Sequence, residues 1–199
     1  NYRRTHVDWN TFYSLIAKAN EIIALYPEGG NTDKEKGLIG QAYAVRGMAY
    51  YYLVQLYQNC VKADGTINSD APAVPMKLLA VEGATEEQID AAMGRNTVKD
   101  LFNQIESDYS KAIENLQNYA PESKNEISLQ VALGLQARYY LLSQQWSKAE
   151  ASARSAQVGY TIMDEKGLQD GFMDISNSEW MWGFDHNTET QTTYASFFS

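Results

Sequence analysis

The chain has 199 residues, which is enough for one ordinary domain with a hydrophobic core. Its 25 acidic and 16 basic residues give a formal net charge of −9. A field of that sign repels phosphate, and the densest basic spot is only Arg3-Arg4, so we expect no nucleic-acid partner. There is no run of about 18 apolar residues, so we expect no bilayer-spanning segment.

Apolar residues at steps of three and four predict a first helix from Trp9 to Tyr26, with Asp8 as its cap. A second helix, from Glu35 to Gln58, is apolar on nearly every side, which is typical of a helix surrounded by protein. We therefore expect the second helix to be the central one. Its tyrosines, together with two later ones, are expected to pack in the core: Tyr50, Tyr51, Tyr52, Tyr109 and Tyr140.

Residues 59–96 have a different composition, because "DGTINSDAPAVP" is rich in turn residues and proline. We interpret this segment as a loop-rich insertion. Within it, the spacing of Thr85 and Gln88 fits a capping box and predicts one short helix.

A third long helix is predicted from Val98 to about Asn118, with Thr97 and Asp100 as a capping box. A helical hairpin follows. Its arms run from Leu129 to Leu142, capped by Ser128, and from Trp146 to Val158. On the second arm the residues Trp146, Ala149, Ala153 and Ala156 are expected to share one face. The hairpin partly matches a tetratricopeptide repeat (TPR), although no further copy at a fixed period is visible.

The segment "EWMWGFDHN" is short and aromatic, which favours a strand over a helix. Trp180 and Trp182 would then share one strand face. The predicted fold class is thus mainly all-α, with TPR-like helical hairpins, the 59–96 insertion and a short β element near the C-terminus. We expect residues 1–199 to form one helical domain that is truncated at both ends.

Six segments in this order resemble the SusD/RagB family, and the resemblance covers most of the chain. The motifs are "WNTFYSLIAKANEIIAL" with Ala19-Asn20, "GQAYAVRGMAYYYLVQLYQN" with Arg46, Val74-Pro75, "RNTVKDLFNQIESDYSKAIENL", "ALGLQARYYLLSQQWSKAEASA" with Ala137-Arg138, and "SNSEWMWGF". One departure is that Tyr57-Gln58-Asn59 lacks the glycine that often follows the aromatic residue at the end of the family's core helix.

The resemblance implies a non-catalytic lipoprotein on the outer-membrane surface of Bacteroidetes-type bacteria. Such a protein binds oligosaccharides or polysaccharides and delivers them to a SusC-like TonB-dependent transporter. The lipid anchor is expected to lie outside this segment. The resemblance leaves the identity of the glycan open.

Binding residues are expected on loops held by a rigid scaffold. In this family, ligand contacts come from the segment before the first helix and from the region after the family's Ser-x-Glu strand, which "SNSEWMWGF" resembles. The candidates are Tyr2, Arg3, His6, Asp185, His186, Asn187 and Tyr194. We expect Tyr194→Ala and His186→Ala to weaken sugar binding without lowering the melting temperature.

We expect no cofactor and no metal. The single cysteine, Cys60, forms no intrachain disulfide, and two histidines far apart in sequence are a poor basis for a zinc site.

Two other readings remain open. A cytoplasmic TPR-like scaffold that binds peptides would show a regular repeat period. An all-helical glycoside hydrolase would need two carboxylates across a cleft. The acidic residues considered for this role, which are expected on solvent faces, are Glu86, Glu87, Glu106 and Glu150.

Overall fold

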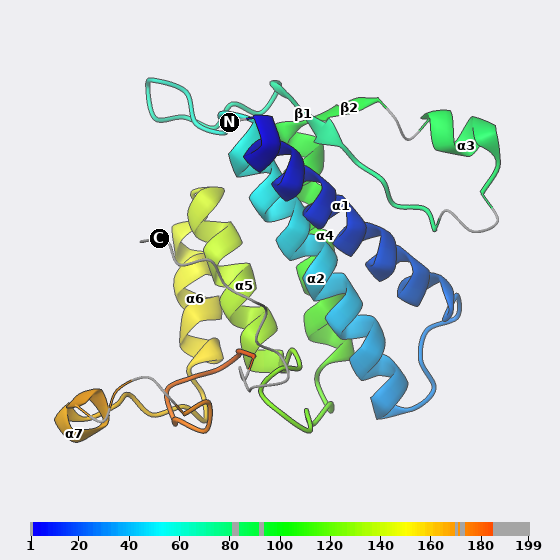
Figure 1. Ribbon diagram of the computed structural model, residues 1–199. Helices are drawn as coiled ribbons and strands as arrows, with labels where there is room; N and C mark the ends of the chain where they lie inside the picture. The colour runs from blue at the N-terminus through cyan, green and yellow to red at the C-terminus, as the bar shows by residue number, and fades with distance from the viewer. Residues whose placement is uncertain (1, 81–83, 92–93, 170, 172–173, 185–199) are drawn as a thin grey trace.

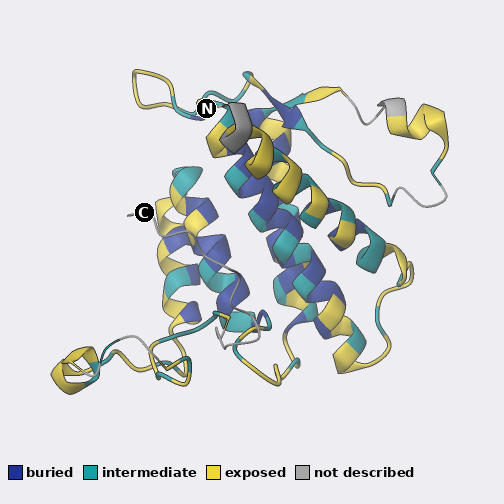
Figure 2. Ribbon diagram, in the orientation of Figure 1, coloured by how far each residue is buried: buried dark blue, intermediate teal, exposed yellow. Residues whose placement is uncertain are grey.

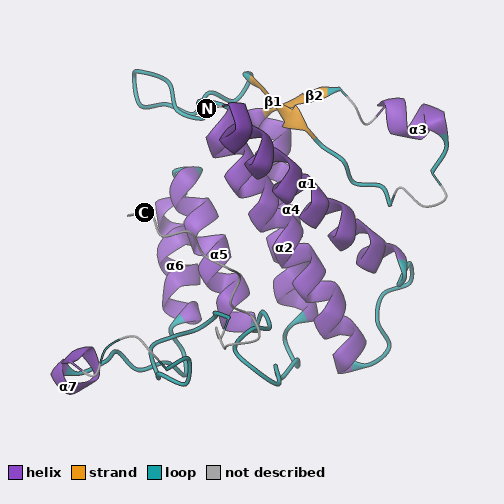
Figure 3. Cartoon of the chain, in the orientation of Figure 1, coloured by secondary structure: helices purple, strands orange, loops and turns teal. Residues whose placement is uncertain are grey.

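The computed structural model describes the chain apart from residues 1, 81–83, 92–93, 170, 172–173 and 185–199. Its elements in chain order are α1 (Tyr2–Ala24), α2 (Asp33–Tyr57), β1 (Pro72–Pro75), α3 (Glu86–Ala91), β2 (Arg95–Thr97), α4 (Val98–Asn115), α5 (Leu129–Leu142), α6 (Trp146–Ala156) and α7 (Glu165–Gln169). The fold is mainly helical, as predicted, with a small two-stranded sheet (Figure 3). In the part of the chain that the structure describes, no helix is both long and apolar enough to cross a membrane.

Helix α2 is the central element of the fold. It contacts α1 on one side and α4 on the other, and the hairpin of α5 and α6 packs against α4 (Figure 1). Because the helices surround it, the middle of α2 is buried on several faces, whereas α1 and α6 are buried on one face only (Figure 2). We refer to α1, α2 and α4 together as the helical framework.

Two glycines in α2 allow the chain after α4 to approach its backbone closely. A Cβ on Gly37 would lie 2.2 Å from the ring of Tyr119, and one on Gly40 would lie 2.7 Å from Leu116. Any larger residue would push α4 and its C-terminal turn away from α2. These glycines therefore set the distance between the two helices.

The predicted core tyrosines are largely confirmed. Tyr50 and Tyr109 are fully buried, and Tyr51 and Tyr140 are at most 9% exposed. Tyr52 is only half-buried, and its ring stacks on that of Phe12, which is half-buried as well.

Three of the predicted helix caps are present in the structure. The side chain of Thr97 accepts a hydrogen bond from the backbone N–H of Asp100, whose carboxylate in turn accepts from Thr97, so the predicted capping box is present. Ser128 accepts from Val131 N–H at the start of α5. Thr85 and Gln88 exchange the expected pair of bonds before α3. Each of these pairs is close in sequence, and for this reason it could be predicted.

The start of the first helix was predicted too late. Helix α1 begins at Tyr2, so Asp8 lies inside it and is not its cap. Residues 2–8 contain neither glycine nor proline to break a helix. Apolar spacing does not mark this start, because residues 5–8 are exposed; Val7, for example, is 60% exposed.

Among the described residues, the two paired strands lie at the insertion, and none lies in the described part of the C-terminal region. Strand β1 pairs antiparallel with β2, with Pro72 opposite Thr97 and Pro75 opposite Arg95. Of the segment "EWMWGFDHN", predicted as a strand, residues 179–184 are described, and they form no strand. This segment makes isolated hydrogen bonds to a loop, such as the one from Gly183 N–H to the Lys124 carbonyl, and not the regular series that joins paired strands.

The second arm of the hairpin also differs from its prediction. Ala149 and Ala156 are buried, but Trp146 is 62% exposed. Ser152, not Trp146, completes the packed face, and its hydroxyl donates to the amide oxygen of Gln136. Position 146 is the first residue of α6, directly after the turn that follows α5.

Candidate functional site

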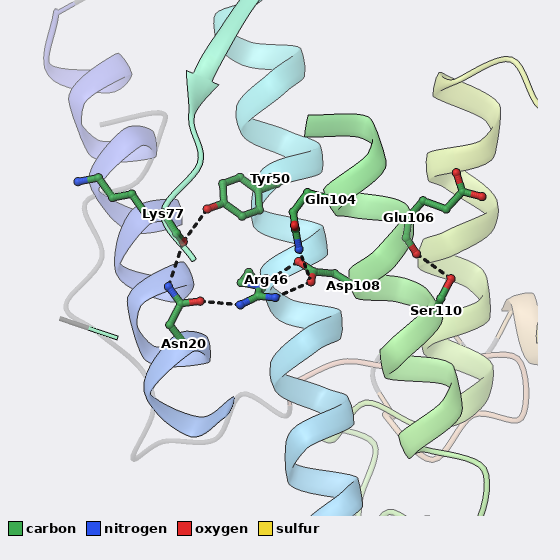
Figure 4. A network of polar contacts seen from close by, with 8 residues as sticks. All are labelled: Asn20, Arg46, Tyr50, Lys77, Gln104, Glu106, Asp108 and Ser110. Carbon is green, nitrogen blue, oxygen red and sulfur yellow. Dashed lines mark hydrogen bonds and ion pairs between the residues drawn. The ribbon is translucent and has the colours of Figure 1, made fainter. Parts of the chain in front are cut away.

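A buried polar network joins the three helices of the framework. The Arg46 guanidinium donates two hydrogen bonds to the Asp108 carboxylate, at 3.0 and 2.6 Å (Figure 4). Its third donor binds the amide oxygen of Asn20 at 2.8 Å, and Gln104 donates to Asp108 at 2.8 Å. Burial by itself lowers the pKa of Arg46, but the bonds and charge of Asp108 outweigh it and raise that pKa, so the guanidinium stays charged.

The same network fixes the first part of the insertion. The amide of Asn20 donates to the carbonyls of Lys77 and Leu79, at 3.0 and 3.1 Å. The Tyr50 hydroxyl donates to the Lys77 carbonyl at 2.8 Å (Figure 4), and the Tyr13 hydroxyl donates to the Pro75 carbonyl at 2.7 Å. Residues 75–79 are therefore held along α1 and α2.

An aromatic pocket lies where the start of α1 meets the end of α2. It is lined by Thr5, His6, Trp9 and Tyr57. The Trp9 and Tyr57 rings are 4.9 Å apart and nearly perpendicular. The Tyr57 hydroxyl donates to the Thr5 carbonyl and so ties the two helices together. Asn10 contacts the His6 ring at 3.1 Å, one helical turn away.

This aromatic pocket is suited to binding a ligand with an apolar face. Half-buried rings beside a polar edge can cover the apolar face of a sugar ring while leaving its hydroxyls accessible to polar groups. Within the described residues, no group of three or more His, Cys, Asp or Glu side chains could hold a metal ion.

The carboxylates considered for a hydrolase are not arranged for acid–base catalysis. Glu106 accepts bonds from Lys148, Tyr139 and Tyr140. Burial alone raises the pKa of Glu106, but these bonds and the Lys148 charge outweigh it and leave the pKa below its ordinary value. A general acid needs the opposite shift. Glu86, Glu87 and Glu150 are exposed.

Of the sequence-predicted site residues, the structure places His6 in the aromatic pocket. Tyr2 and Arg3 belong to helix α1, not to a loop, and only their backbone is described. The other candidates, Asp185, His186, Asn187 and Tyr194, lie outside the described residues.

Sequence reasoning missed Trp9 and Tyr57 as pocket residues. The three-residue step from His6 to Trp9 could have placed both on one helix face, had α1 been predicted to start earlier. Tyr57 is 52 residues away from its partner Thr5, and no local pattern signals such a contact.

Comparison with known proteins gives a consistent result. Residues 1–141 match the SusD-like family model that is described as starch-binding associating with outer membrane. A SusD-like carbohydrate binding protein from Bacteroides vulgatus is 24% identical, with a TM-score of 0.74 over 92% of this chain and 37% of its own. A putative sugar binding protein from Bacteroides vulgatus is 25% identical, with a TM-score of 0.62 over 82% of this chain and 33% of its own.

A laminarin binding SusD-like protein is 20% identical, with a TM-score of 0.59 over 78% of this chain and 32% of its own. No curated protein matches the sequence. The chain spans between 32% and 37% of the length of these three solved relatives.

Proposed function

Because the chain belongs to the SusD-like family of starch-binding proteins that associate with the outer membrane, we propose that it captures oligosaccharide or polysaccharide at the bacterial surface without catalysing a reaction. The protein would be a surface lipoprotein. It would pass the glycan to a SusC-like TonB-dependent transporter.

The aromatic pocket is the observation that carries this proposal. Its two rings are held in place before any ligand arrives, because Tyr57 is bonded to the Thr5 carbonyl and Trp9 also contacts Tyr13 at 4.7 Å. Preformed aromatic surfaces bind with little loss of side-chain freedom. We propose that Trp9 and Tyr57 contact the sugar ring and that His6 binds a hydroxyl. Tyr2, Arg3, Asp185, His186, Asn187 and Tyr194 are proposed to extend this contact.

The test compares two tryptophan variants. Trp9→Ala removes a ring from the aromatic pocket, whereas Trp146→Ala removes a 62% exposed ring from α6 and serves as the matched control. Binding of maltooligosaccharides and laminarin oligosaccharides is measured by calorimetry. We expect Trp9→Ala to weaken binding at least tenfold, about 1.4 kcal/mol, and Trp146→Ala to leave it unchanged.

Trp9 also contributes to packing, so the His6→Ala variant, whose side chain is exposed, provides a second test with the melting temperature as readout. We expect weaker sugar binding with an unchanged melting temperature. The proposal fails if the intact chain binds no glycan of a broad panel, or if Trp9→Ala and Trp146→Ala bind equally well. Release of reducing sugar would contradict its non-catalytic part.

A further inference from the structure

A groove lies at the opposite end of α2 from the aromatic pocket. We call it the Tyr119 groove, and its lining includes Asp33, Leu38, Gln41, Tyr119, Glu122 and Glu126. It forms between the start of α2 and the loop that follows α4. Gln41 and Tyr57 are 16 positions apart on α2, so at a rise of 1.5 Å per residue the two regions are separated by roughly 24 Å.

The Tyr119 ring is held rigidly in this groove. It lies directly against the backbone of Gly37, where a Cβ would approach the ring to 2.2 Å. Its hydroxyl donates to Oε2 of Glu126 at 2.5 Å and accepts a bond from the amide of Gln41 at 3.4 Å. Burial and the Glu126 carboxylate raise the pKa of Tyr119 to about 12, so the hydroxyl keeps its proton at neutral pH.

The polar groups around the ring are oriented as well. The Gln41 side-chain oxygen accepts from Ile127 N–H at 3.0 Å, which fixes the direction of its amide. Oε2 of Glu126 also accepts from Glu122 N–H at 3.0 Å. Among the described residues, the second carboxylate oxygen, Oε1 of Glu126, makes no hydrogen bond, so this groove-lining residue has an acceptor to offer.

The charge of the groove limits the ligand class. Asp33, Glu122 and Glu126 line it against a single lysine, Lys34. Phosphate, sulfate and uronate groups are repelled by that excess of carboxylates. Carboxylates accept hydrogen bonds from hydroxyl groups, while the Tyr119 ring and Leu38 offer apolar surface beside them. Hydroxyl groups next to an apolar face are the chemistry of a neutral sugar.

We propose that the Tyr119 groove is a second carbohydrate-binding site, selective for neutral sugars. This second proposal depends on the function proposed above only because it assumes that the ligand is a glycan. It does not require the aromatic pocket. Since both sites lie on one continuous helix, a polysaccharide long enough to reach both gains avidity that a short oligosaccharide lacks.

The test records amide chemical shifts of the full chain in the Trp9→Ala background, during titration with neutral oligosaccharides: maltoheptaose, laminarihexaose and cellohexaose. We expect at least one of them to shift signals from residues 33–41 and 118–126. Ala120→Trp fills the groove from an exposed position and should abolish these shifts. Ala63→Trp, at an exposed position in the insertion, is the matched control and should preserve them.

Glu126→Gln keeps the shape of the side chain and removes its charge. We expect it to weaken neutral-sugar binding several-fold. Glucuronate-containing oligosaccharides should bind the original groove at least tenfold more weakly than neutral ones. Uronate binding as strong as glucose binding would overturn the charge argument.

The two proposals fail in different ways. If all shifts lie near residues 5–13 and 57 and vanish in Trp9→Ala, the second site is wrong and the aromatic pocket stands. If the original chain, with Trp9 in place, shows shifts only in the Tyr119 groove, the aromatic pocket is wrong. If no neutral sugar of the panel shifts residues 33–41 and 118–126, the second site is overturned.

Discussion

The helical framework and the insertion are stabilised in different ways. The framework is dense, and its buried charges are matched within it: Arg46 and Asp108 have side-chain exposures of 6% and 0%. The insertion has short elements and many exposed residues, and side chains of α1 and α2 hold it by main-chain carbonyls. A change in the framework should therefore affect the stability of the whole chain, whereas a change at the insertion should have mainly local effects.

The largest effect is expected for Arg46→Met. This change leaves the Asp108 carboxylate buried without its partner, which typically costs about 3–5 kcal/mol. Urea denaturation should show a loss of that size in the free energy of unfolding. The double variant Arg46→Met/Asp108→Leu removes both charges and should recover most of it. A loss below about 1 kcal/mol in the single variant would mean that the buried charge pair does not stabilise the framework.

Two glycines provide the next contrast. Gly37→Ala places a methyl group into the Tyr119 ring and should cost about 1–3 kcal/mol of global stability, as overpacking does. Gly65, in the insertion, has open space around it but a φ of +84°. Gly65→Ala should therefore cost about 1 kcal/mol through backbone conformation alone. Hydrogen exchange should show the effect of Gly65→Ala only around residues 60–68. Faster exchange throughout the chain in this variant would weaken the contrast between the insertion and the framework.

Tyr50→Phe should be milder. It removes one donor from the Lys77 carbonyl, which Asn20 still satisfies, so the cost should be about 1 kcal/mol or less. Exchange of amides in residues 76–80 should become faster while those in α4 stay protected. Equal acceleration in both regions would show that the insertion and the framework open together.

Glu106 provides a pH-dependent case at the contact between α4 and the α5–α6 hairpin. Its folded pKa lies below the ordinary value of 4.5, so its stabilising contribution is present above that pH and is lost as the pH falls through the folded pKa. Because the Glu106–Lys148 ion pair is partly exposed, we expect it to contribute about 0.5 kcal/mol to the free energy of unfolding. The difference in melting temperature between the original chain and Glu106→Gln should shrink between pH 6 and pH 3. A constant difference would contradict this.

The smallest effect is expected for Tyr109→Phe. The Tyr109 hydroxyl is buried without a hydrogen-bond partner among the described residues. Removing it should leave the free energy of unfolding unchanged or raise it by less than about 0.5 kcal/mol. A clear loss of stability would reveal that this hydroxyl is solvated or bonded in solution.

Much of the fold could be predicted because its signals are local. The capping residues Thr97 and Ser128, and the near-continuous apolar surface of α2, lie within a few residues of what they determine. The aromatic pocket and the polar network could not be predicted in this way, since Tyr57 meets Thr5 across 52 positions and Arg46 meets Asp108 across 62. The strand predicted from the alternating tryptophans at 180 and 182 is wrong for a related reason. A strand needs a partner strand, and the sequence alone does not show that the described residues offer none there.

The anchors of the insertion have a consequence for how this protein can diverge. Tyr13, Asn20 and Tyr50 all donate to main-chain oxygens, those of Pro75, Lys77 and Leu79. Every amino-acid type carries that oxygen, so these bonds require a particular backbone path and not particular side chains. Drift in the sequence of residues 75–79 should leave the attachment intact. For the same reason, a foreign loop that follows the same path could be grafted at this place without redesigning the helices beneath it.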